Sequence, residues 1–118
     1  MNKISFQDFE RIMSCDLLKK KARKVDPCIE IEFCVDDCAE YEESWMGKML
    51  DKETNQDVYW YGLTPDCLQA YDYGTLEEFL NAKVFHGRSI KEIWDSVSLY
   101  SLDGGPAHEC LPFYLDSP

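Results

Sequence analysis

The sequence predicts one α+β domain over residues 1–118, built on a small and mainly antiparallel sheet of about four strands. A helix pattern opens the chain, a two-residue apolar alternation follows it, and two helix-capping sequences come later. These observations give the expected order α-β-β-β-α-α-β, with an N-terminal helix and two short C-terminal helices. A length of 118 residues is typical of a single domain and is sufficient for one core.

The N-terminal helix is expected to start at Ser5, whose hydroxyl can cap the first turn. Apolar residues then recur at helical spacing, at Phe6, Phe9, Met13 and Leu17. We expect the helix to end near Lys24, because Asp26 precedes a proline and a residue in that position avoids the helical conformation.

The next three elements are expected to be strands. Apolar and polar side chains alternate in residues 28–35, which places the two kinds on opposite faces of a sheet. Residues 44–50 and 58–63 are rich in apolar and aromatic side chains and flank a polar, turn-prone segment, residues 51–57. We therefore expect these two segments to form a hairpin.

Two short helices and a last strand are expected after the hairpin. Residues 75–78 and 89–92 each carry the Ser/Thr-x-x-Glu capping box, followed by apolar residues. Residues 97–102 alternate again and predict the final strand. The tail, residues 107–118, is too apolar for a free end, so we expect it to pack back on the domain.

Composition narrows the functional classes. The chain carries 23 acidic and 12 basic residues, a net charge of −11, which repels nucleic-acid phosphates and anionic lipid. The first residues lack the apolar core of a signal peptide, and no apolar run is long enough to span a bilayer. We therefore expect a cytoplasmic protein that binds neither nucleic acid nor membrane, and whose six cysteines are reduced.

An acidic stretch is the strongest functional signal. No lysine or arginine lies between Asp26 and Glu43, where carboxylates are frequent. We expect a non-enzymatic protein-binding domain, such as an inhibitor, an immunity-like protein or an adaptor, that uses this surface against a basic protein. Tyr59 and Tyr61 are expected to serve as apolar anchors nearby. The carboxylates expected to bind the partner are Glu30, Glu32, Asp36, Asp37, Glu40, Glu42 and Glu43.

A basic run, residues 19–24, lies just before the acidic stretch. Cations at the C-terminal end of a helix interact favourably with its dipole, so we expect this run to have a structural role. It could also pack against the acidic strand and neutralise part of its charge.

Two alternative functions remain open from the sequence. A small cytosolic enzyme could use a cysteine or a carboxylate, with His86 or His108 as the base. A zinc-stabilised module could use Cys34, Cys38, His108 and Cys110, although only the first pair has a usual ligand spacing. No motif identifies a catalytic residue, a metal ligand or a cofactor site, so none is assigned.

Overall fold

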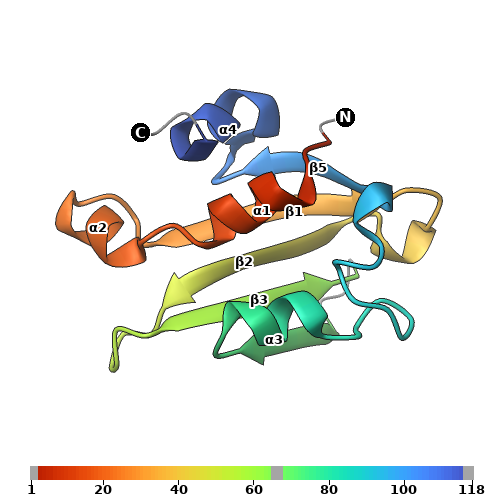
Figure 1. Ribbon diagram of the computed structural model, residues 1–118, viewed down its shortest axis with the longest axis horizontal. Coiled ribbons are helices and arrows are strands. Elements are labelled where there is room, and N and C mark those ends of the chain that lie inside the picture. Colours follow the sequence, from red (N-terminus) through yellow and green to blue (C-terminus); the bar gives the residue numbers. More distant parts are fainter. Residues whose placement is uncertain (1–2, 65–67, 116–118) are drawn as a thin grey trace.

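The computed structural model describes residues 3–64 and 68–115, and it has the predicted α+β class. Within these ranges four α-helices accompany one antiparallel sheet of six strands, in the order β4-β3-β2-β1-β5-β6 (Figure 1). The strands are β1 (Cys28–Val35), β2 (Ser44–Leu50), β3 (Asp57–Leu63), β4 (Gln69–Tyr73), β5 (Val97–Leu102) and β6 (Gly105–Pro106). The helices are α1 (Phe6–Met13), α2 (Leu17–Ala22), α3 (Leu76–Asn81) and α4 (Ala107–Leu115), with 3₁₀ turns η1 (Ala39–Tyr41) and η2 (Trp94–Ser96).

The predicted strands over residues 28–35, 44–50, 58–63 and 97–102 are confirmed as β1, β2, β3 and β5. The expected count of about four strands is wrong, because β4 and β6 were not predicted. Neither sequence has an alternating apolar pattern, and each strand forms by pairing with a neighbour already in the sheet, β3 or β5. The chain order expected from the sequence is therefore also wrong.

The N-terminal segment forms two helices instead of one. Asp16 ends the predicted continuous helix because its carboxylate accepts hydrogen bonds from the backbone N–H groups of Leu18 and Lys19, at 2.9 and 3.3 Å. This is an N-cap arrangement, and it starts α2 in a new direction. Ser5 caps α1 as expected, accepting from the N–H of Asp8 at 3.1 Å.

The two capping boxes have different outcomes. Thr75 caps α3 as predicted, accepting from the N–H of Glu78 at 3.1 Å. Ser89 and Glu92 also exchange both capping hydrogen bonds, at 3.0 and 3.2 Å, but a turn and η2 follow instead of an α-helix. The segment between this cap and β5, which begins at Val97, therefore does not become the second predicted helix.

The apolar tail packs back on the domain as α4, a helix that the sequence did not predict. Its Tyr114 hydroxyl accepts a hydrogen bond from the Lys20 ammonium at 2.8 Å and bonds to the Asp103 carboxylate. These groups join α4 to α2 and to the turn after β5. Arg11 of α1 holds the end of the helix by donating to the carbonyl of Leu115 at 2.8 Å.

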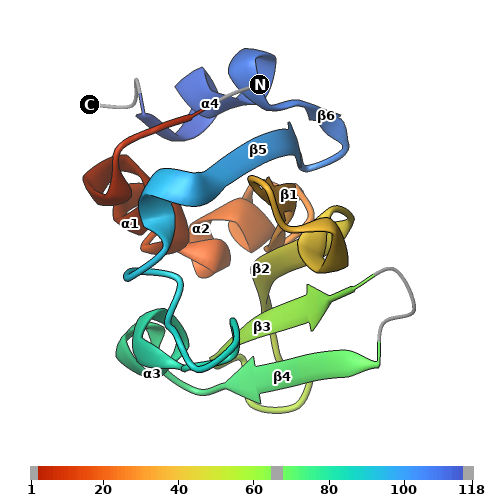
Figure 2. The same cartoon turned by 90° about the vertical axis from the view of Figure 1, so that its right-hand side faces the viewer.

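The core lies between the helices and one face of the sheet. Figure 2 shows α1 and α3 on the same side of the strands. Aromatic rings fill this core. Tyr61 of β3 stacks on Phe79 of α3 with ring centroids 4.2 Å apart, which joins the sheet to a helix, and Phe9 of α1 stacks on Trp94 of η2 at 4.4 Å. The opposite face of the sheet therefore stays accessible.

Among the described residues, no helix combines the length and the apolar character that crossing a bilayer requires.

Candidate functional site

The face of the sheet that points away from the helices is the candidate site, and we call it the open face. Strand alternation and register decide its membership, because directly paired residues of an antiparallel sheet point to the same side. Its side chains mix carboxylates with large apolar groups. The open face comprises Glu30, Glu32, Cys34, Trp45, Gly47, Met49, Val58, Trp60, Gly62, Ala70, Asp72 and Tyr100.

Two tryptophans give the open face its apolar area. Trp45 is 37% exposed and Met49 is 44% exposed, unusually high values for large apolar side chains. Trp60 lies over two glycines: its ring atoms approach the positions that Cβ atoms would take at Gly47 and Gly62, to 3.0 and 4.0 Å. Glycine at these positions lets the indole lie along the sheet.

The open face has no positive charge of its own. Lys48 is the only basic residue in the six described strands, and it points into the core with 1% exposure. Its ammonium donates to the carbonyls of Met13 and Cys15, at 2.8 and 2.7 Å, at the end of α1. The Lys48 ammonium therefore lies on the helix-covered side of the sheet, and it does not neutralise the carboxylates of the open face.

Glu30 and Glu32 belong to this face, and neither carboxylate forms an ion pair with any residue that the structure describes. The Glu32 carboxylate accepts one hydrogen bond, from the Ser101 hydroxyl at 3.4 Å. The Glu30 backbone N–H donates to the carboxylate of Asp103 at 3.0 Å, and the charge of Asp103 is balanced by the Lys20 ammonium at 3.7 Å. The acidic strand predicted from the sequence is thus accessible to a partner.

Two of the predicted carboxylates are partly neutralised inside the protein. Lys3 pairs with Asp36 at 2.6 Å, and the Ser98 hydroxyl donates to the same carboxylate at 2.8 Å. These two hydrogen bonds hold the pKa of Asp36 below its ordinary value. Glu40 pairs with His86, whose ring can compensate its charge when protonated.

The remaining predicted carboxylates, Asp37, Glu42 and Glu43, are exposed and make no ion pair with any described residue. They follow β1 in the loop that contains η1. Five of the seven carboxylates predicted to bind a partner are therefore free of an ion pair, and the basic run of residues 19–24 does not neutralise any of them.

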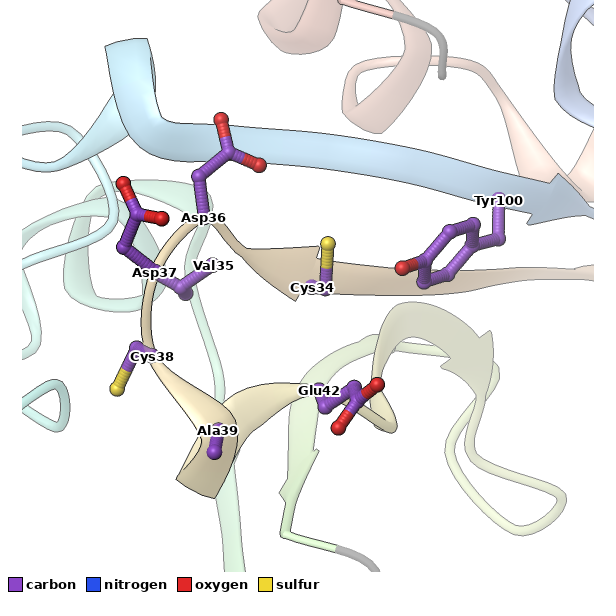
Figure 3. Close-up of a pocket in the computed structure, with 8 residues that line it drawn as sticks. All are labelled: Cys34, Val35, Asp36, Asp37, Cys38, Ala39, Glu42 and Tyr100. Carbon is purple, nitrogen blue, oxygen red and sulfur yellow. The ribbon is translucent and has the colours of Figure 1, made fainter.

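A depression of about 650 Å³ extends the open face toward this loop. It is lined by Cys34, Val35, Asp36, Asp37, Cys38, Ala39, Glu42 and Tyr100 (Figure 3). The Tyr100 hydroxyl lies toward the Cys34 thiol, and hydrogen bonding to Cys34 raises the pKa of Tyr100 to about 12. Tyr100 therefore stays neutral at physiological pH and offers an aromatic surface, 39% exposed, beside the carboxylates.

The expected anchors Tyr59 and Tyr61 lie elsewhere. They are 7% and 1% exposed and face the helices, where the Tyr61 hydroxyl donates to the carbonyl of Phe79 at 2.8 Å. The expectation that these two rings are available to a partner is wrong. Alternate residues of β3 point to opposite faces of the sheet, and the sequence did not decide which set faces the core. The two tyrosines face the core because they pair with Lys48 and Met46 on the inner face of β2.

The aromatic residues of the open face are instead Trp45 and Tyr100, which are exposed, and Trp60, which is half-buried; none of the three was predicted as an anchor from the sequence. A signal was present: Gly47 and Gly62 interrupt two apolar strands, and each pairs across the sheet with a tryptophan. A glycine opposite a tryptophan leaves space for the ring on that side, so the two glycines identify the face that the indoles occupy.

The residues considered for catalysis form only a partial set. Cys38 and His86 line the same depression of about 340 Å³, beside Tyr41 and Arg88, and His86 also contacts Glu40. No hydrogen bond between the Cys38 thiol and the His86 ring occurs in the described structure. His108 is exposed on α4 and lies 3.9 Å from the carboxylate of its neighbour Glu109. Cys67 lies outside the described residues.

The residues considered for zinc are not gathered. Cys34 lies on β1, Cys38 in the following loop, and His108 and Cys110 on α4. In the described part of the chain, no three His, Cys, Asp or Glu side chains form a group able to hold a metal ion. The zinc hypothesis is therefore not supported by the geometry of its own ligands.

Comparison with known proteins finds no family model, no curated protein and no solved structure that matches this chain. A function for this chain is therefore inferred from its fold and its open face.

Proposed function

We propose that this chain is a non-enzymatic protein-binding domain that docks a basic protein on the open face of its sheet. The observation that carries the proposal is the combination of exposed aromatic side chains with unpaired carboxylates on one uncovered sheet face. The acidic groups supply the charge complementarity that steers a partner and fixes its orientation. Trp45, Trp60 and Tyr100 supply the aromatic surface from which interface hot spots are most often built.

The two halves of this surface are continuous. Glu30 and Glu32 lie on β1 next to the tryptophans of β2 and β3, and Cys34 leads along the same strand into the depression bordered by Glu42. A basic partner that covers the open face therefore meets carboxylates over its whole length. An isolated acidic loop would only attract a basic partner electrostatically, whereas the open face also has apolar surface that the partner can bury on binding.

The test compares two double variants that change the net charge equally. Glu30→Gln/Glu32→Gln removes charge from the open face, and Glu53→Gln/Glu77→Gln removes it from the β2–β3 turn and from α3, both exposed. Proteins captured from the native extract by the unaltered chain are purified, and their affinities for all three chains are measured at several salt concentrations.

We expect the open-face variant to bind at least about tenfold more weakly and the control variant to bind as the unaltered chain does. Affinity for the unaltered chain should fall as salt is raised, because salt screens exposed charges. Equal affinities for the two double variants, or an affinity independent of salt, would contradict the proposal.

A further inference from the structure

The register of the sheet places a carboxylate beside a tryptophan in two neighbouring rows of the open face. In the first row, Glu30 of β1 pairs with Gly47 of β2, Gly47 with Trp60 of β3, and Trp60 with Asp72 of β4. Because Gly47 has no side chain, the Trp60 indole extends over it toward β1, and carboxylates stand at both ends of the row.

The second row lies two residues further along each strand. Glu32 of β1 pairs with Trp45 of β2, and Trp45 with Gly62 of β3. On the other side of Glu32, the Ser101 hydroxyl holds the carboxylate through the 3.4 Å hydrogen bond. This row therefore repeats the first, with an exposed indole next to a carboxylate that no described cation neutralises.

This arrangement fits a guanidinium group better than an ammonium group. A guanidinium is planar, stacks on an indole face and can donate two parallel hydrogen bonds to one carboxylate. An ammonium is a compact and strongly hydrated point charge, which gains less from a flat aromatic surface. Each row supplies the two features that arginine uses together.

We infer that the open face selects arginine over lysine in its partner, and that it binds two arginine side chains, one in each row. This inference rests on the proposed function and names the chemistry of the partner. Residues two apart on one strand face are separated by about 6.7 Å. Arginines at alternate positions of an extended segment have this spacing, and arginines one turn apart on a helix come close to it.

The experiment uses two capped peptides of identical length and charge. One carries two arginines at alternate positions, and its twin carries lysines at both. Binding to the full chain is followed by NMR through the indole N–H signals of its three tryptophans. Trp94 is an internal reference, because it is 8% exposed and its indole N–H donates to the carbonyl of Ile4 at 2.8 Å, away from the open face.

We expect the arginine peptide to bind about threefold or more tightly than the lysine peptide and to shift the signals of Trp45 and Trp60 while that of Trp94 stays in place. Trp45→Leu should reduce the preference for arginine while leaving the salt-dependent binding of both peptides. Glu30→Gln/Glu32→Gln should weaken both peptides. The dispersion of the amide spectrum verifies that each variant is folded.

Three results would overturn the inference. Equal affinities for the two peptides would remove arginine selectivity and leave the basic-partner proposal standing, since charge alone would then explain binding. A preference for arginine that stays undiminished in both Trp45→Leu and Trp60→Leu would place the discrimination outside the two rows. Failure of the arginine peptide to bind at low salt would also refute the inference, while the proposed function is tested separately, by the variants measured against captured partners.

Discussion

At the scale of single residues, one buried cation has an unusual position. Lys48 lies on β2, yet its ammonium donates hydrogen bonds to backbone carbonyls at the end of α1 and just after it. The same ammonium lies 3.7 Å from the carboxylate of Asp57. Its aliphatic stem crosses the core beside the Tyr59 ring, with the ammonium 5.2 Å from the ring centroid. A single side chain thus bonds the first helix to the middle of the sheet.

Replacing this lysine should be costly. Lys48→Met keeps the apolar stem and removes the donor, which leaves the carbonyls of Met13 and Cys15 without it. We expect a loss of about 2–3 kcal/mol in the free energy of unfolding, measured by urea denaturation. The control is Lys52→Met in the exposed β2–β3 turn, which should change stability by less than about 0.5 kcal/mol. Equal effects of the two changes would contradict this account.

Asp36 makes stability depend on pH in a defined direction. Its folded-state pKa is lowered by hydrogen bonds from Lys3 and Ser98, so its contribution is present above the unfolded-state value, about 3.9, and is lost as pH falls through the lower folded-state value. Asp36→Asn should therefore reduce the urea midpoint at about pH 7 and have little effect well below about pH 3.

The neighbouring substitution Asp37→Asn is the matched control for this experiment. Asp37 is exposed and has no described ion pair, and asparagine tolerates its positive φ of 59°. A loss of stability of similar size from Asp37→Asn at neutral pH, or a pH-independent effect of Asp36→Asn, would show that the Lys3–Asp36 contact is not responsible.

At the scale of the elements, the close pairing of β1 with β2 requires a glycine. A Cβ atom at Gly47 would stand 1.9 Å from the carbonyl oxygen of Ile29, a backbone atom that cannot move without disturbing β1. At Gly62, on the adjacent strand and the same face, the nearest atom is 4.0 Å away. The two glycines look alike in sequence and differ sharply in their surroundings.

Gly47→Ala should therefore cost about 3 kcal/mol or more in the free energy of unfolding, at the upper end of the range for overpacking. Gly62→Ala should have a far smaller effect, since an added methyl group meets only ordinary van der Waals contact. Thermal unfolding followed by circular dichroism compares the two. A tolerated alanine at residue 47 would show that β1 and β2 are not as close as described.

The elements also show how far sequence patterns reach. Strands with internal alternation, such as residues 28–35, could be predicted because half of each strand faces a core. β4 could not, because its place depends on hydrogen bonding to β3 rather than on its own apolar residues. α4 was missed for a related reason: Pro112 and a mixed apolar pattern hide a helix whose position is fixed by contacts with Lys20 and Arg11.

The candidate site was predicted in the same uneven way. The acidic character of the open face follows directly from Glu30 and Glu32 on the outward phase of β1. Predicting which aromatic residues lie on the open face requires the register between β3 and β2. This register is set by pairing across the sheet and cannot be read from either segment alone. Asp36 could not be recognised as neutralised, because its partner Lys3 lies 33 positions earlier in the chain.

At the scale of the whole molecule, a net charge of −11 on 118 residues opposes the compact state through self-repulsion. The carboxylates of the open face concentrate part of this repulsion on one strand. Raising salt from about 10 mM to about 150 mM shortens the Debye length from about 30 Å to about 8 Å, so the repulsion should weaken. We expect the urea midpoint of the unaltered chain to rise over this range.

The rise should be smaller in Glu30→Gln/Glu32→Gln than in Glu53→Gln/Glu77→Gln, although both variants have the same net charge. A smaller rise in the open-face variant would show that the repulsion arises among the carboxylates of the open face and not from the net charge of the whole chain. A midpoint that is constant with salt, or that responds equally in both variants, would count against a concentrated negative field.

The strand order β4-β3-β2-β1-β5 has a consequence for synthesis on the ribosome. The meander from β1 to β4 emerges first, while β5, which must pair with β1, emerges only after α3 and the turns that follow it. Until then β1 presents an unpaired edge with Ile31 and Phe33 uncovered on one side. This nascent chain is most prone to aggregation in that interval, and the arrival of residues 97–102 ends it.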